Sequence, residues 1–236
     1  MTAASGSLRR AAAWAVHGLT ASSAAAGILA VLAAERGDAR AALAWMAYTL
    51  AVDSIDGTLA RALEVKRVLP IVDGTRLDDI VDYFTYVIVP ALFLLHLDLL
   101  PAGAAVPVAF CPVLASAIGF SRADAKTADH FFTGFPSYWN IVAFYLWGLG
   151  WPRVVNAAVV IAFSIAVFVP IRYVYPSRTR VLRPLTIALG LAWGATVLAV
   201  LARPGAPPRA VVAASLAFPV YYTLLSLALH ASREAP

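Results

Sequence analysis

The sequence is poor in charge and nearly devoid of cysteine, and each scarcity excludes a class of protein. Only 13% of its 236 residues are charged, about half the fraction of about 25% that is usual in soluble domains. The single cysteine, Cys111, allows neither a disulfide framework nor a thiolate metal site within one chain. The four histidines show no spacing typical of metal ligands; they stand at positions 17, 96, 130 and 230. An ordinary soluble protein and a zinc site are therefore not expected.

Hydrophobic residues make up 61% of the chain. They gather in stretches that are long enough, or nearly so, to cross a bilayer, which takes about 17 to 25 apolar residues in a helix. Ala, Gly, Ser and Thr recur within them and allow close helix packing. We therefore predict an all-α integral membrane protein, a single polytopic domain over 1–236 that forms a bundle of about eight transmembrane helices. The predicted spans are 11–34, 40–63, 77–99, 104–121, 137–151, 154–175, 184–202 and 210–230. The fifth of these spans is the shortest.

The basic residues indicate how the chain is oriented. When the loops are assigned alternately to the two sides, 13 of the 18 Lys and Arg lie on the side that holds both termini. The positive-inside rule then predicts cytoplasmic termini, with Gly74 and Lys126 in or beside cytoplasmic loops and Arg153 outside. The net charge of +5 reflects this topology and an attraction to anionic lipid, so no nucleic-acid partner is expected. An arginine pair at positions 9 and 10 also fits a secretory signal, but we interpret the first span as uncleaved.

Four aspartates stand at helical spacing inside two of the predicted spans. A charged Asp at the bilayer centre costs about 2.5–3.5 kcal/mol, so four of them require a compensating partner. The first two are i and i+3 and the last two i and i+4, so each pair shares one helix face. Their oxygen atoms suit Mg²⁺ or Mn²⁺ better than a soft metal. The two motifs are Asp53-x2-Asp56-Gly57-x2-Ala60-Arg61 and Gly74-x3-Asp78-x3-Asp82.

The short connection between the two motifs predicts a helical hairpin over about 40–99, which brings the four carboxylates into one recess that faces the cytoplasm. Gly57 and Gly74 expose backbone on the carboxylate faces, and Ala60 keeps its face small. Arg61 can pair with a phosphate group. Two other interpretations stay open, namely Asp–Arg pairs that only join helices and the ion site of a cation transporter, although transporters commonly show repeats and none is evident here.

The two motifs together resemble the signature of the CDP-alcohol phosphotransferases, integral membrane enzymes of phospholipid synthesis. The spacer of twelve residues between Arg61 and Gly74 resembles the bacterial phosphatidylcholine synthase branch, whose members join CDP-diacylglycerol to free choline. A loop at 124–140 resembles that branch too, although its Phe-x-Gly-x-Pro core is shared with phosphatidylserine synthases. The resemblance implies a transferase in the bacterial inner membrane that acts on CDP-diacylglycerol and choline among membrane lipids, and it implies a homodimer. Serine, glycerol phosphate or inositol phosphate stay open as alternative acceptors.

The resemblance also implies a role for each motif residue. Two divalent ions, Mn²⁺ or Mg²⁺, clamp the diphosphate and neutralise the charge that develops on the departing CMP. A carboxylate takes the proton of the alcohol during attack, and Asp82 is the preferred general base as well as a possible further ligand. The implied metal ligands are Asp53, Asp56, Asp78 and Asp82, and the implied cytidine diphosphate pocket comprises Gly57, Ala60, Arg61 and Gly74.

Choline carries a quaternary ammonium that cannot donate a hydrogen bond, so an aromatic face is its natural receptor. Tyr86 is i+4 from Asp82 and shares its helix face. Tyr138 and Trp139 open the fifth predicted span beside a cytoplasmic loop. We therefore predict Tyr86, Tyr138 and Trp139 as choline contacts, with anchoring at the membrane interface as the alternative for the last two.

Overall fold

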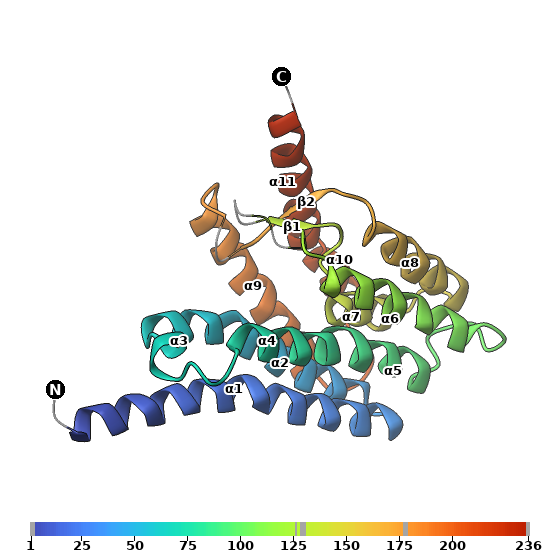
Figure 1. Ribbon diagram of the computed structural model, residues 1–236. Coiled ribbons are helices and arrows are strands. Elements are labelled where there is room, and N and C mark those ends of the chain that lie inside the picture. The colour runs from blue at the N-terminus through green and yellow to red at the C-terminus, as the bar shows by residue number, and fades with distance from the viewer. Residues whose placement is uncertain (1–2, 126, 128–130, 177–178, 235–236) are drawn as a thin grey trace.

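The computed structural model of the chain is almost entirely helical, as predicted, and describes residues 3–125, 127, 131–176 and 179–234. Lys126, which the topology prediction uses, therefore lies outside the described residues. A two-stranded sheet is the non-helical element of the described chain (Figure 1).

The elements are α1 (Ala3–Glu35), α2 (Ala39–Ala62), α3 (Val65–Val68), α4 (Gly74–Asp82), the π-helix η1 (Tyr83–Ile88), α5 (Val89–His96), α6 (Ala105–Ser121), β1 (Phe131–Thr133), α7 (Trp139–Leu149), α8 (Arg153–Ala166), β2 (Arg172–Val174), α9 (Arg183–Ala202), α10 (Arg209–Ser215) and α11 (Ala217–Glu234).

Helices occupy each of the eight predicted spans, and α4, η1 and α5 form one continuous rod. Within the described residues, four helices are long and apolar enough to cross a membrane: α1, the rod Gly74–His96, α9 and the segment Arg209–Ser232. Helices α6, α7 and α8 are apolar but shorter. Many large apolar side chains are exposed on the outer helix faces, as suits contact with lipid tails. The chain is thus an all-α membrane protein.

The sixth predicted span is wrong at its end. The apolar run predicts a helix over 154–175, but α8 ends at Ala166 and residues 172–174 form strand β2. Pro170 lies within the run, and a proline disfavours helical geometry in the residue before it and supplies no N–H. Hydropathy alone therefore extended the helix too far.

Small side chains bring α1 and α2 together. The two helices are joined at Gly37 and Asp38, where Gly37 has a φ of +76° and the Asp38 side chain accepts a hydrogen bond from the N–H of Ala41. Buried alanines such as Ala30 and Ala34 line the α1 side of the contact, which lets the two backbones approach closely. Helix α1 thereby lies along both halves of the predicted hairpin, and the N-terminus and α3 lie at the same end of the bundle (Figure 1).

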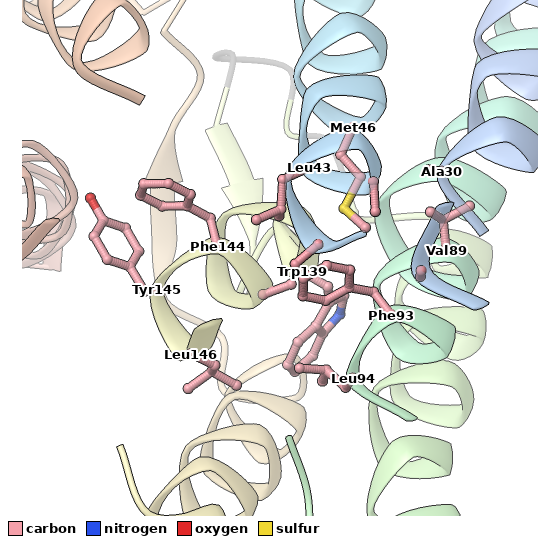
Figure 2. Close-up of a cluster of buried hydrophobic side chains, with 14 of the residues drawn as sticks. Ala30, Leu43, Met46, Val89, Phe93, Leu94, Trp139, Phe144, Tyr145 and Leu146 are labelled. Atoms are coloured by element: carbon pink, nitrogen blue, oxygen red, sulfur yellow. The ribbon is translucent and has the colours of Figure 1, made fainter. Parts of the chain in front are cut away.

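Helix α7 fills the centre of the protein with large side chains. Trp139, Phe144, Tyr145 and Leu146 of this helix are all buried. Figure 2 shows Trp139 beside Phe93 and Leu94 of α5, whereas Tyr145 points away from α2 and α5. Because α7 is only 11 residues long, it rises about 16 Å at 1.5 Å per residue. It is therefore too short to cross a hydrocarbon core of about 30 Å, and Trp139 in its first turn is buried in the bundle.

The sheet ties the C-terminal helix to the rest of the fold. Strands β1 and β2 pair antiparallel, with Phe132 opposite Tyr173. Both backbone groups of Val174 in β2 bond to α11, since its N–H donates to Ser226 Oγ at 3.1 Å and its carbonyl accepts from Tyr222 Oη at 2.8 Å. Helix α11 is thus fixed to a strand that precedes it by some forty residues.

Candidate active site

Three of the four predicted metal ligands converge. Asp53 of α2 and Asp78 and Asp82 of α4 are half-buried, and one oxygen of each lies within 4.8 Å of the other two. Asp53 is nine residues from the end of α2 at Ala62, which places it about 14 Å along the helix from the hairpin loop. The cluster thus lies between α2 and α4, set back along α2 from the end of the bundle that carries α3.

Three ionised carboxylates at this separation repel one another and could together hold a metal ion. Two unit charges 4.8 Å apart repel by about 3 kcal/mol at an effective dielectric constant of about 20. Oxygen ligands of one Mg²⁺, bound at about 2.1 Å, lie at most about 4.2 Å from each other. Small rotations of the side chains would therefore bring the three oxygens onto a divalent ion, and hard carboxylate ligands are those that Mg²⁺ and Mn²⁺ prefer.

Asp56, the fourth predicted ligand, has a different environment. It is buried, with 5% of its surface exposed, and its Oδ2 accepts a hydrogen bond of 2.6 Å from Thr20 Oγ1 of α1. It is not part of the group of three described above. Thr20 was not identified in the sequence analysis, although a polar side chain within an apolar span is itself a signal of function.

The π-helix η1 carries the next side chain of the site, Tyr86. Tyr86 Oη donates a hydrogen bond of 2.8 Å to Asp53 Oδ2, so the ring reaches across from η1 to α2. The N–H of Val89 bonds to the carbonyl of Phe84, one residue further back than in an α-helix. Pro90 has no N–H to donate to Tyr86 and its ring would press on that carbonyl, which accounts for the wider turn. The turn begins directly after Asp82.

The residues predicted to surround the cytidine diphosphate follow the two helices towards the hairpin loop. A methyl group at Gly57 would meet only Arg61 Nη1 of its own helix, at 3.3 Å, so this face is otherwise open. The Arg61 guanidinium is exposed and donates to Thr58 Oγ1 at 2.9 Å. Ala60 instead packs against an apolar cluster that includes Ala13 of α1.

Gly74 makes a contact that the motif does not reveal. A methyl group there would lie 3.2 Å from Cε1 of His17, which is buried on α1. His17 and Thr20 are i and i+3 on one helix face, so the same side of α1 touches the second motif at Gly74 and the first at Asp56. The first helix is therefore part of the site's surroundings.

The three aromatic residues predicted for choline do not all lie together. The rings of Tyr86 and Tyr138 are neighbours, with centroids 6.1 Å apart. Trp139 is buried in the core (Figure 2), where its Nε1 donates to Ser116 Oγ at 2.8 Å and its ring meets Phe135. These contacts favour a packing role for Trp139, whereas Tyr138 faces the site.

Tyrosines that were not predicted extend this aromatic group. Tyr222 of α11 lies 6.3 Å from Tyr138, and Tyr173 of β2 lies 6.2 Å from Tyr222, measured between ring centroids. Neither has a motif around it, and their proximity to Tyr138 depends on the docking of α11 onto β2. Sequence spacing could not have identified them.

The chain is similar to several curated bacterial proteins, each named phosphatidylcholine synthase. It is 46% identical to the protein of Legionella pneumophila over 168 residues, which cover 71% of this chain and 66% of that protein. It is 37% identical to the protein of Pseudomonas aeruginosa over 186 residues, 79% of this chain and 78% of that protein. It is 40% identical to the protein of Mesorhizobium japonicum over 190 residues, 79% of this chain and 71% of that protein.

The chain spans slightly less than two thirds of the length of two Legionella relatives, 66% and 63%. No family model matches it. The similarity to the Pseudomonas protein nevertheless covers more than three quarters of both chains, and the resemblance predicted from the two aspartate motifs is confirmed. The chain belongs to the phosphatidylcholine synthase family.

Proposed function

We propose that the protein transfers the phosphatidyl group of CDP-diacylglycerol to choline and releases CMP. The observation that carries this proposal is the convergence of Asp53, Asp78 and Asp82 in a chain of this family. The names of the relatives support choline as the acceptor. The half-buried position of the cluster between membrane helices suits a substrate that is itself a lipid.

Asp53, Asp56 and Asp78 would hold two divalent ions, and Asp82 lies beside Asp53 and Asp78. Bound Mg²⁺ or Mn²⁺ would neutralise the diphosphate and the charge that develops on the departing CMP. The open face at Gly57, next to the exposed Arg61, leaves space for the nucleotide end of the substrate. We assign Ala60 and Gly74 to the walls of that pocket.

Asp82 would serve as the general base. It accepts the proton of the choline hydroxyl while the choline oxygen forms a bond to the phosphorus of the phosphatidyl group. The bond between that phosphorus and the oxygen of CMP breaks, and CMP leaves with the electron pair. Attack and departure are in line on opposite sides of the phosphorus.

Tyr86 and Tyr138 would bind the trimethylammonium group of choline on their ring faces. Tyr86 already reaches Asp53 through its hydroxyl, so a cation on its ring lies near the carboxylates. We leave Trp139 out of this group because its ring and its Nε1 are engaged in the core.

We further propose that the protein lies in the bacterial inner membrane with both termini and the site on the cytoplasmic side. The excess of basic residues on that side supports this orientation. The homodimer that the resemblance implies stays a prediction.

The test uses purified protein in detergent with CDP-diacylglycerol, Mn²⁺ and one labelled alcohol at a time. CMP release and labelled phosphatidylcholine are expected with choline. Product with serine, glycerol phosphate or inositol phosphate instead would keep the reaction but change the acceptor. No CMP release with any alcohol, from protein that is monodisperse and folded, would refute the enzymatic proposal.

A further inference from the structure

Four tyrosines from four separate elements form a row that starts at the aspartate cluster. Neighbouring ring centroids are 6.1 Å apart for Tyr86 and Tyr138, 6.3 Å for Tyr138 and Tyr222, and 6.2 Å for Tyr222 and Tyr173. The first member is bonded to Asp53 through its hydroxyl. The row therefore leads from the carboxylates of α2 to the C-terminal helix α11.

The rings of Tyr86, Tyr138 and Tyr222 are inclined to one another and do not stack. The planes of Tyr86 and Tyr138 meet at 49° and those of Tyr138 and Tyr222 at 64°. We call the group of these three inclined rings the aromatic corner; the pair Tyr173–Tyr222, at 20°, is stacked instead. One face of Tyr222 is thus covered by Tyr173, and its ring meets that of Tyr138 edge to face.

The hydroxyl groups of two members of the row are already engaged. Tyr86 Oη donates to Asp53 and Tyr222 Oη donates to the carbonyl of Val174. These bonds hold the two rings in place and occupy their hydroxyls, so a ligand would contact the ring faces. Tyr86 and Tyr222 are only 3% and 9% exposed, and a cation–π contact is stronger where water is excluded.

We propose that Tyr222 is a specificity-determining residue of the acceptor site, completing with Tyr86 and Tyr138 an aromatic receptor for a quaternary ammonium. The inference rests on the proposed function, since it takes choline as the acceptor. The cation lies in the corner, and the hydroxyl of the same small molecule is directed towards Asp82. The C-terminal helix thereby belongs to the site through the strand that holds it.

The experiment measures the Michaelis constants for choline and for CDP-diacylglycerol in Tyr222→Phe, Tyr222→Leu and Ser226→Ala. Leucine removes the aromatic face, and the choline constant should rise about tenfold with that for CDP-diacylglycerol nearly unchanged. Phenylalanine keeps the face and should stay within about threefold of wild type. Ser226→Ala is the matched control, because it removes the other bond from α11 to Val174 without touching a ring, and its choline constant should stay near that of wild type.

A second series guards against variants that fail to fold. Phenylalanine analogues with one, two and three ring fluorines at position 222 keep the size of the ring while weakening its negative face, so the choline constant should rise stepwise. A flat series, or equal increases for both substrates in Tyr222→Leu and Ser226→Ala, would overturn the inference and leave the enzyme assignment intact. Wild-type protein that never uses choline would overturn the proposed function and this inference with it.

Discussion

The hydrogen bond between Thr20 and Asp56 gives the sharpest test of the metal site. The substitution Thr20→Val keeps the shape of the side chain and removes only the hydroxyl that donates to Asp56 Oδ2 at 2.6 Å. Since Asp56 is only 5% exposed, water cannot readily replace the lost donor. We expect the variant to bind Mn²⁺ more weakly because the carboxylate is no longer held in place.

The size of the effect follows from the bond. A hydrogen bond to a charged group is worth about 1.5–3 kcal/mol, and about 1.4 kcal/mol is a factor of ten. The Mn²⁺ concentration for half-maximal CMP release should therefore rise about 10- to 100-fold, the range found when a group behind a metal ligand is removed. Turnover at saturating Mn²⁺ should change by no more than about fivefold if Asp56 still reaches its ion.

The assay is a Mn²⁺ titration of CMP release in detergent, with the melting temperature measured in parallel. Thr20→Ser retains a hydroxyl and should restore the wild-type titration. Thr49→Val is the matched control, because Thr49 is as deeply buried but its hydroxyl donates to the carbonyl of Met46. A Thr20→Val titration that coincides with wild type would refute the assignment of Asp56 to the metal.

Three further predictions concern the carboxylates and the orientation. Asp53→Asn should lower turnover at least about a hundredfold in protein that still inserts, and substantial activity would remove Asp53 from the ligand set. EDTA should abolish wild-type activity until Mn²⁺ is restored, and activity that persists in EDTA would remove the metal from the reaction. Asp82→Asn should bind CDP-diacylglycerol nearly normally and transfer almost nothing, so a loss of nucleotide binding would instead make Asp82 a metal ligand. In a Cys111→Ser background, an impermeant maleimide applied to intact cells should label Arg153→Cys and spare Arg76→Cys, and the reverse pattern would invert the topology.

The aspartate cluster could be predicted from the sequence because its geometry is local. Asp78 and Asp82 are i and i+4 on one helix, and only a short loop connects that helix to the one bearing Asp53. Helical periodicity and a hairpin suffice to bring such residues together. The long-range contacts of the site, to Thr20 and Tyr222, depend on how α1 and α11 pack, and no spacing in the sequence encodes that packing.

Composition predicted the membrane helices well and their ends less well. Apolar runs identify α1 and α9 because residues facing lipid and residues facing other helices are both apolar. The same property hides where a helix stops inside the protein, as at Ala166, where the chain turns into β2 before the apolar run has ended. Trp139 illustrates a related ambiguity, since a tryptophan at a helix start fits an interface, a ligand site or, as its contacts here favour, a core.

Tyr86 connects the proposed metal site to the proposed choline site. The contributions of its hydroxyl and of its ring can be tested separately. The hydroxyl bonds to Asp53, whereas the ring adjoins Tyr138. Tyr86→Phe removes only the bond to Asp53, the proposed metal ligand, so it should raise the Mn²⁺ requirement about tenfold or more and leave the Michaelis constant for choline nearly unchanged. Tyr86→Leu removes the ring as well and should raise both quantities. If Tyr86→Phe weakened choline binding as much as Tyr86→Leu does, the hydroxyl and not the aromatic face would be the choline contact, and the cation–π argument would fail at this residue.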